Sequence, residues 1–233
     1  MKIVFTPDWF LNNDVLIETF SFLILVLFFL FAIKSYKLSE KKNVLYLGIG
    51  FLLIALAELA SIVTKFILYY DFNVTQEIGQ AIITYKIVSS VDIFYYLGFF
   101  FQRFFTMLGF YVIYKTRTAT KGEFLFTVYL LFAIAALSQP FYYVYHITSL
   151  MLLGLIINNY YKVYKEDKVA NTRVLLFAFS LLALSQIIFI FSKLGLVYVL
   201  AQNIQLISYA ILLVLIVKII KNGPKEKQSR NNP

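Results

Sequence analysis

Seven apolar stretches separated by short polar segments make up most of this chain. They cover residues 15–33, 44–63, 88–114, 124–138, 141–161, 174–192 and 196–220. About 20 apolar residues in a helix, at about 1.5 Å of rise each, cross the ~30 Å hydrocarbon core of a bilayer. The pattern therefore predicts an all-α integral membrane protein with seven transmembrane helices. Residues 75–85 are predicted to form a short interfacial helix, and residues 221–233 a disordered, basic cytoplasmic tail.

The composition agrees with burial in lipid. Hydrophobic residues make up 61% of the 233 and charged residues 14%, whereas soluble domains are about 45–50% apolar and about 25% charged. The net charge of +9 does not indicate nucleic-acid binding, because no basic, aromatic-rich soluble segment is present. The chain has no cysteine, which excludes disulfides and thiolate catalysis.

The lysines and arginines predict the orientation. Nearly all of them lie in the loops after the first, third, fifth and seventh stretches, while the other loops hold only Lys65, Lys86 and Lys193. Cytoplasmic loops of membrane proteins carry the excess of Lys and Arg. We therefore expect the N-terminus outside and the C-terminus inside, in a plasma or cytoplasmic membrane.

The chain also contains an internal repeat. Tyr36–Lys65 aligns without gaps with Tyr164–Lys193, 128 residues later, and about a third of the positions are identical. Each copy is a basic loop, an apolar helix and one lysine at the far end. A duplication of this kind is found in many membrane transporters.

The repeat predicts a single domain, residues 1–220, made of two three-helix halves. The halves are residues 15–114 and 141–220, joined by a linker helix at 124–138. An odd number of linking helices gives both halves the same orientation, so this is a parallel 3+1+3 repeat with a pseudo-twofold axis along the membrane normal. The plan resembles that of PQ-loop and sugar-efflux transporters. Their Pro-Gln pair is absent, and Gln139-Pro140 has the reverse order.

Two short motifs carry a second resemblance, confined to the first half of the chain. Ala57-Glu58-Leu59 in the second stretch and Tyr96-Leu97-Gly98-Phe99 in the third are similar to the seven-helix sensor regions that precede some histidine kinases. The resemblance implies ligand sensing, with the output carried by a separate cytoplasmic partner.

Ionisable residues inside the apolar stretches are the first candidates for a site, because they are costly in lipid. Arg103 lies near the middle of the third stretch and Glu58 late in the second. Their depths differ by a few helical residues, so an ion pair between them is predicted, with Asp92 as the alternative partner. A pair that only fixes helix packing is an equally supported interpretation.

Further polar residues lie in the outer half of the predicted bundle. Gln186 is the repeat mate of Glu58, so the two are expected to face one axial cavity, and His146 is expected to be a hydrated, interfacial histidine. The inner halves of the stretches are mostly apolar, which predicts a pocket that opens outward. The predicted ligand-binding residues are Glu58, Asp92, Arg103, Gln186, Gln202 and Asn203.

These features predict a small seven-helix receptor or sensor that binds a ligand from the outer side and signals to a cytoplasmic partner. The alternative is a small-solute transporter that works at the interface of the two halves. No nucleophile–base pair, phosphate loop or metal-ligand cluster is visible, so no enzyme, cofactor or metal is expected. An intramembrane lipid-modifying activity is the one enzymatic alternative. The ligand and the oligomeric state are open.

Overall fold

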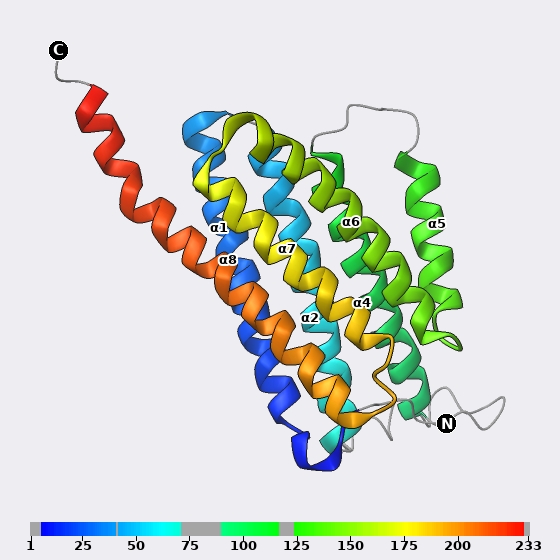
Figure 1. Ribbon diagram of the computed structural model, residues 1–233. Coiled ribbons are helices and arrows are strands. Elements are labelled where there is room, and N and C mark those ends of the chain that lie inside the picture. The colour runs from blue at the N-terminus through cyan, green and yellow to red at the C-terminus, as the bar shows by residue number, and fades with distance from the viewer. Residues whose placement is uncertain (1–5, 41, 71–89, 117–123, 231–233) are drawn as a thin grey trace.

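The computed structural model describes residues 6–40, 42–70, 90–116 and 124–230, and this part of the chain is all-helical. A short 3-10 helix, η1, precedes seven α-helices that run alternately up and down (Figure 1). The elements are η1 (Asp8–Phe10), α1 (Asn13–Ser39), α2 (Lys42–Tyr70), α4 (Ser90–Lys115), α5 (Phe124–Leu137), α6 (Tyr142–Asp167), α7 (Ala170–Phe189) and α8 (Gly195–Arg230).

Each predicted apolar stretch corresponds to one helix, and most helices extend into the flanking polar residues. The clearest correction concerns the tail, which was predicted to be disordered from residue 221, whereas α8 continues to Arg230. Lys, Glu, Gln and Arg are good helix formers, and extending an existing helix avoids the cost of nucleation. The predicted interfacial helix at 75–85 lies outside the described residues.

Five of the described helices, α1, α2, α4, α7 and α8, are long and apolar enough to cross a membrane. Of the other two, α5 has only 14 residues and α6 carries more polar side chains along its 26 residues. Large apolar side chains are exposed around the whole bundle, for example Phe20, Leu125 and Val214. Soluble monomers rarely expose apolar surface on this scale. Length and composition therefore indicate an integral membrane protein.

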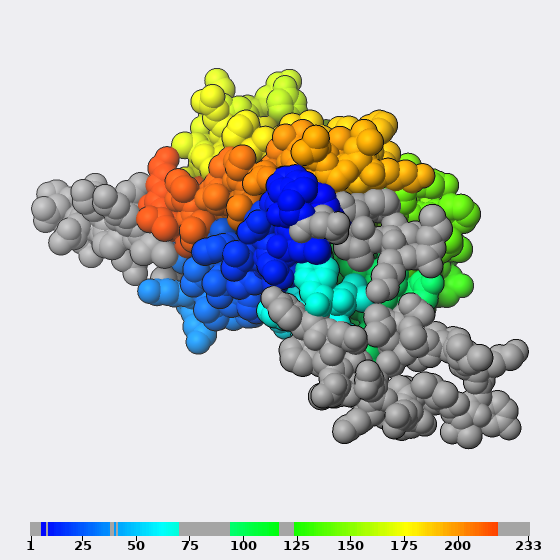
Figure 2. Space-filling model, turned by 90° about the horizontal axis from the view of Figure 1, so that it is seen from below, coloured from blue at the N-terminus to red at the C-terminus, as the bar shows by residue number. Residues whose placement is uncertain are grey.

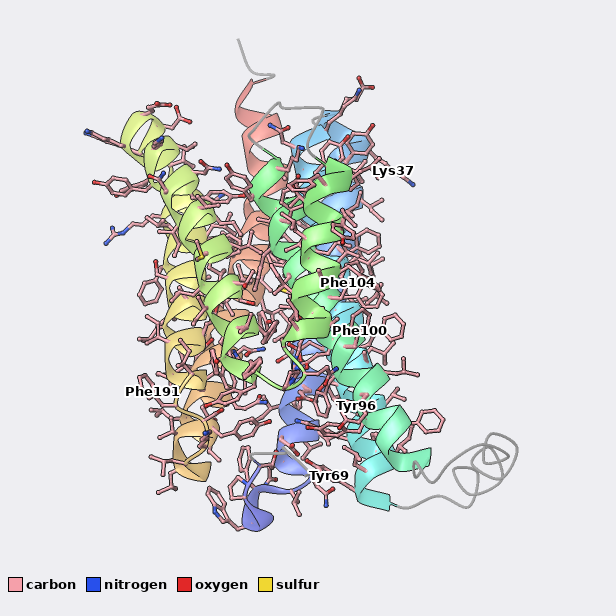
Figure 3. All side chains as sticks on the ribbon, turned by 90° about the vertical axis from the view of Figure 1, so that its right-hand side faces the viewer. Lys37, Tyr69, Tyr96, Phe100, Phe104 and Phe191 are labelled. Atoms are coloured by element: carbon pink, nitrogen blue, oxygen red, sulfur yellow. The ribbon has the colours of Figure 1, made fainter. Side chains whose placement is uncertain are left out.

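Six helices form a closed ring, in which each helix packs against the next in the order α1, α2, α4, α6, α7, α8 and back to α1. The remaining helix, α5, lies outside the ring against α4 and α6 (Figure 1). We call the end that carries η1 the η1 end, and the opposite end the basic end. Figure 3 shows Lys37 at the basic end and Tyr69 at the η1 end. Seen from the η1 end, the first residues of α1 lie between α8 and α2 (Figure 2).

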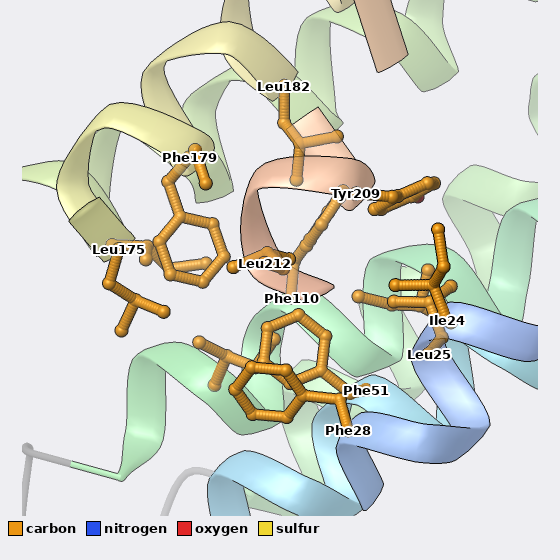
Figure 4. Close-up of a cluster of buried hydrophobic side chains, with 14 of the residues drawn as sticks. Ile24, Leu25, Phe28, Phe51, Phe110, Leu175, Phe179, Leu182, Tyr209 and Leu212 are labelled. Carbon is orange, nitrogen blue, oxygen red and sulfur yellow. The ribbon is translucent and has the colours of Figure 1, made fainter. Parts of the chain in front are cut away.

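Buried apolar side chains fill the interior of the ring toward the basic end. Phe51 of α2 and Phe179 of α7 stack across the interior, with ring centroids 6.2 Å apart and an interplanar angle of 7°. We call this cluster the apolar layer, and Figure 4 shows its members from α1, α2, α4, α7 and α8. It comprises Leu25, Phe28, Phe51, Phe110, Phe179, Leu182, Tyr209 and Leu212.

A second, smaller cluster fixes α5 to the outside of the ring. It consists of Met107 and Tyr111 from α4, Leu131 and Ala135 from α5, and Tyr145 from α6. The three helices therefore share one buried core, even though α5 has no place in the ring itself.

Two glycines allow α2 and α4 to approach closely. A Cβ atom built on Gly109 of α4 would lie 2.7 Å from the backbone oxygen of Gly50 of α2. Small residues at such crossings let helix backbones pack against each other in membranes. Side chains at these two positions would force the helices apart, and the interior of the ring depends on this contact.

We predict that Gly109→Ala lowers stability, because its methyl group would overlap the Gly50 carbonyl, and overpacking costs about 1–3 kcal/mol. Gly154→Ala in α6 is the matched control. No atom lies within 4 Å of the added Cβ there, and alanine is favoured over glycine in a helix by about 1 kcal/mol. Thermal unfolding of the two purified variants in the same detergent measures the difference. Equal midpoints would contradict the predicted close contact.

Candidate functional site

A cavity of about 110 Å³ lies inside the ring, between the apolar layer and the η1 end. About 10–15 Å³ of such volume holds one water, so the cavity can hold several waters or a small solute. Phe110, Leu182 and Tyr209 of the apolar layer form its floor. Its polar wall includes the charged residues Glu18, Glu58, Lys65 and Arg103 and the amides Gln186, Gln202 and Gln205.

The strongest electrostatic interaction at the cavity is a buried ion cluster of Asp14, Glu18 and Lys65. Lys65 Nζ of α2 lies 2.8 Å from Asp14 Oδ2 and 2.5 Å from Glu18 Oε1 of α1. The two acids are four residues apart, which places both carboxylates on one face of α1. Ser61, one turn before Lys65, donates to Glu18 Oε1 at 3.0 Å. All four side chains are buried.

Hydrogen bonds extend this cluster to other parts of the fold. Thr6, which precedes η1, donates to Asp14 Oδ2 at 3.1 Å, and Tyr69 at the end of α2 donates to the same oxygen at 2.8 Å. Lys65 Nζ donates to the hydroxyl of Tyr198 in α8 at 3.2 Å. Gln202, one turn further along α8, donates to that hydroxyl at 2.9 Å. The cluster therefore joins the N-terminal segment, α1, α2 and α8.

Glu58 faces the cavity from α2 and is held by α8. Its Oε1 accepts hydrogen bonds from Gln205 Nε2 at 2.9 Å and from the Tyr209 hydroxyl at 3.4 Å. Glu58, Ser61 and Lys65 are spaced by three and four residues, so they share one face of α2. Glu58 lies on this face of α2, and Ser61 and Lys65 of the same face contact Glu18 of α1. Two carboxyl groups, Glu18 and Glu58, therefore line the cavity.

His146 and Gln186 contact each other at the cavity. His146 Nδ1 of α6 lies 2.8 Å from Gln186 Oε1 of α7. With the amide oxygen as acceptor, the hydrogen bond places the ring proton on Nδ1. The imidazole also stacks on Phe189, with ring centroids 5.2 Å apart. His146 also lines the cavity.

The ion pair predicted between Glu58 and Arg103 is not formed in the described part of the chain. Arg103 Nη1 donates instead to the backbone oxygen of Ser138 at 2.7 Å and to its hydroxyl at 3.2 Å. Ser138 follows the last turn of α5, where unpaired carbonyls carry partial negative charge. The sequence indicated that Arg103 lies near the middle of its helix. It did not indicate that the residue after α5 would provide the acceptor.

The structure brings four of the six predicted site residues to one cavity, namely Glu58, Arg103, Gln186 and Gln202. Asn203 lies elsewhere, since it is exposed and donates to the Val199 carbonyl at 2.8 Å. One residue along a helix turns the side chain by about 100°, which separates Asn203 from Gln202. Asp92 lies in α4, and its side chain is outside the described ones.

The sequence interpretation missed the ion cluster. Glu18 lies within an apolar stretch, four residues after Asp14, and that position alone marks it as a candidate. Lys65 was interpreted as a cation at a helix end, and its burial depends on the two acids of another helix. The repeat offered a further signal for Glu18. Glu18 and His146 are separated by 128 residues, as are Glu58 and Gln186, so all four side chains occupy matching polar positions in the two halves.

Comparisons with protein-family models, with curated proteins and with solved structures found no match for this chain. The site must therefore be interpreted from its own geometry. Within the described residues, no three His, Asp or Glu side chains are grouped to hold a metal ion. The cavity instead combines charged groups, amides and aromatic rings.

We predict that Lys65→Met strongly destabilises the protein, because it leaves Asp14 and Glu18 buried without a counter-charge. Removing one partner of a buried ion pair costs about 3–5 kcal/mol. The matched control is Lys193→Met, at the repeat mate of Lys65, where the side chain is exposed and the change should stay within about 0.5 kcal/mol. Thermal unfolding in detergent compares the two.

The double variant Lys65→Met with Glu18→Gln should recover part of the lost stability, since it removes one uncompensated charge. If Lys65→Met and Lys193→Met unfold at the same temperature, the ion cluster does not stabilise the fold.

Proposed function

We propose that this chain is a seven-span membrane receptor or sensor that binds a small polar ligand in the cavity from the outer side. Ligand binding is proposed to shift the helices and signal to a cytoplasmic partner. One observation carries the proposal: the ring is polar and hollow toward the η1 end but filled by the apolar layer toward the basic end. A ligand can therefore enter from one side only in this conformation.

The distribution of charge supports an outward-facing η1 end. On the η1 side of the apolar layer the described cations are Lys193, which is exposed, Lys65, which is neutralised in the ion cluster, and Arg103, which lines the cavity and is bonded to Ser138. Cytoplasmic loops carry the excess of Lys and Arg, so the basic end belongs inside. The exposed cations of that end include Lys34, Lys37, Lys162, Lys165, Lys168 and Arg173.

Seven spans require that α5 and α6 cross the membrane in addition to the five apolar helices. With 26 residues, α6 is about 39 Å long at about 1.5 Å per residue, and it occupies a place in the ring between α4 and α7. Its polar side chains can face the cavity and the helix ends. The shorter α5 runs antiparallel to both α4 and α6 (Figure 1).

The arrangement of contacts supports a parallel repeat of two halves. A twofold axis would relate α1 to α6, α2 to α7 and α4 to α8. Under that operation the contact of α1 with α8 becomes the contact of α6 with α4, and both are present. Phe51 and Phe179, which are repeat mates, stack on each other, as equivalent residues do close to a twofold axis.

Burial supports extending the repeat into α1 and α6, at the same spacing of 128 residues. Ser21 and Ser149 are both buried, as are Leu25 and Leu153. Leu27 and its mate Leu155 both face outward, with exposed fractions of 50% and 44%. Matching inner and outer faces are expected if the two helices occupy equivalent places in a duplicated bundle.

A small-solute transporter is the second candidate, and one observation favours it. The cavity lies between the two halves, with Glu58 contributed by the first half and its repeat mate Gln186 by the second. Transporters built from repeats bind their substrates at such an interface and open it alternately to the two sides. A transporter must move the apolar layer apart, whereas a receptor need not.

We predict the topology from this orientation. The native chain has no cysteine, so single cysteines report on one position each. Cysteines replacing Gln139 and Leu194, at the η1 end, should react with an impermeant maleimide added outside intact cells. Cysteines replacing Lys37 and Glu166 should react only after the membrane is permeabilised. Reversed labelling would overturn the orientation and the proposed side of ligand entry.

We predict that a cysteine replacing Gln186 reacts with a small polar thiol reagent added outside and not with one added inside. The cavity reaches the η1 end, and the apolar layer blocks water from the basic end. A cysteine replacing Ala178, which is fully buried in α7, is the control and should not react from either side.

Each alternative result has a distinct meaning in this experiment. Reactivity from both sides at Gln186→Cys, altered by a solute gradient, would favour the transporter. The same absence of reactivity as at Ala178→Cys would mean a dry core and contradict both functions.

A further inference from the structure

We propose that the cavity binds a small organic cation with N–H donors, a protonated amine, held by the carboxylates of Glu18 and Glu58. This inference names the ligand class and rests on the proposed function of the cavity as a binding site. Three independent observations carry it: an unpartnered carboxylate oxygen, an unbalanced charge and an aromatic wall.

The unpartnered oxygen belongs to Glu18. Its Oε1 accepts from Ser61 and pairs with Lys65, but its Oε2 is buried and has no hydrogen-bond partner. Glu18 itself is 4% exposed and lines the cavity. A buried carboxylate oxygen without a donor is costly, and an ammonium group supplies such donors together with a compensating charge.

The charges around the cavity are not balanced among the described side chains. Asp14, Glu18 and Glu58 are acidic, whereas Lys65 and Arg103 are basic, which leaves one net negative charge when all are ionised. Lys65 is already held between Asp14 and Glu18 and Arg103 bonds to Ser138, so among the described residues Glu58 has no cation in contact and accepts from the neutral donors Gln205 and Tyr209. A buried carboxyl group stays neutral unless a counter-charge lies beside it, so a monovalent cation, unlike an anion, would stabilise the ionised form of Glu58 and fits this site better.

Aromatic rings make up much of the remaining wall. Those that line the cavity include Tyr95, Phe99, Phe110, Phe189, Tyr198 and Tyr209. The faces of aromatic rings attract cations and also pack against apolar groups. An organic ammonium ion uses both properties, whereas an inorganic ion is held mainly by a shell of oxygen ligands. The wall thus favours an amine with a short apolar substituent.

The experiment uses the full chain in lipid nanodiscs at neutral pH and measures the unfolding temperature. Propylammonium chloride is the probe. Propan-1-ol has a similar shape without charge, sodium chloride tests an inorganic cation, and sodium propionate tests an anion. We expect a saturable rise in unfolding temperature with propylammonium and none with the other three at equal concentration.

The variant Glu58→Gln keeps an acceptor oxygen for Gln205 and Tyr209 but removes the charge. We expect it to raise the half-saturating concentration of propylammonium at least tenfold. Glu166→Gln, which removes an exposed carboxylate at the basic end, is the matched control and should leave that concentration unchanged.

Equal stabilisation by propan-1-ol or by sodium chloride would overturn the proposal, as would an unchanged response in Glu58→Gln. The comparison of the four probes on the wild-type chain decides even if that variant fails to fold. Absence of any effect from propylammonium would reject the amine class. The cavity as a binding site is tested separately, since labelling of Gln186→Cys from outside does not depend on which ligand binds.

Discussion

The burial of Lys65 between Asp14 and Glu18 is the interaction on which the rest of the site depends. Helices satisfy their own backbone hydrogen bonds in a membrane, so the costly groups are the polar side chains. Here one ammonium compensates two carboxylates that would otherwise be uncompensated in the interior of the ring. The contact fixes how α1 is rotated against α2. It also fixes where Glu18 meets the cavity, and the Tyr198 hydroxyl connects α8 to the same point.

A single face of α2 contributes to the apolar layer, to the cavity and to the ion cluster. Phe51 belongs to the apolar layer, Glu58 stands at the cavity, and Lys65 lies in the ion cluster. These residues are seven apart, close to two helical turns, and therefore point in similar directions. Tyr209 of α8 joins the apolar layer to the cavity, because its ring packs in the apolar layer while its hydroxyl reaches Glu58. A displacement of α2 or α8 would therefore change both the apolar layer and the cavity.

The sequence predicted the helices well because a bilayer requires long apolar segments with internally satisfied backbones. It also placed Glu58 and Gln186 at one cavity, from their matching positions in the sequence repeat. It could not assign partners. Arg103 lies near the middle of its helix, but its acceptor is Ser138, just after α5. Asn203 is one residue from Gln202 but faces another side of α8. Depth follows from position along a helix, whereas rotation and partners follow from tertiary packing.

The N-terminal segment gives the molecule a native optical probe in η1. Trp9 is the only tryptophan, 61% exposed, and its ring meets the buried Phe10 edge-on at 5.4 Å. Two residues before it, Pro7 packs against Gly195 at the start of α8, and Thr6 lines the cavity and bonds to Asp14. The emission of one indole therefore reports on the segment that connects the ion cluster to the surface, without any label being introduced.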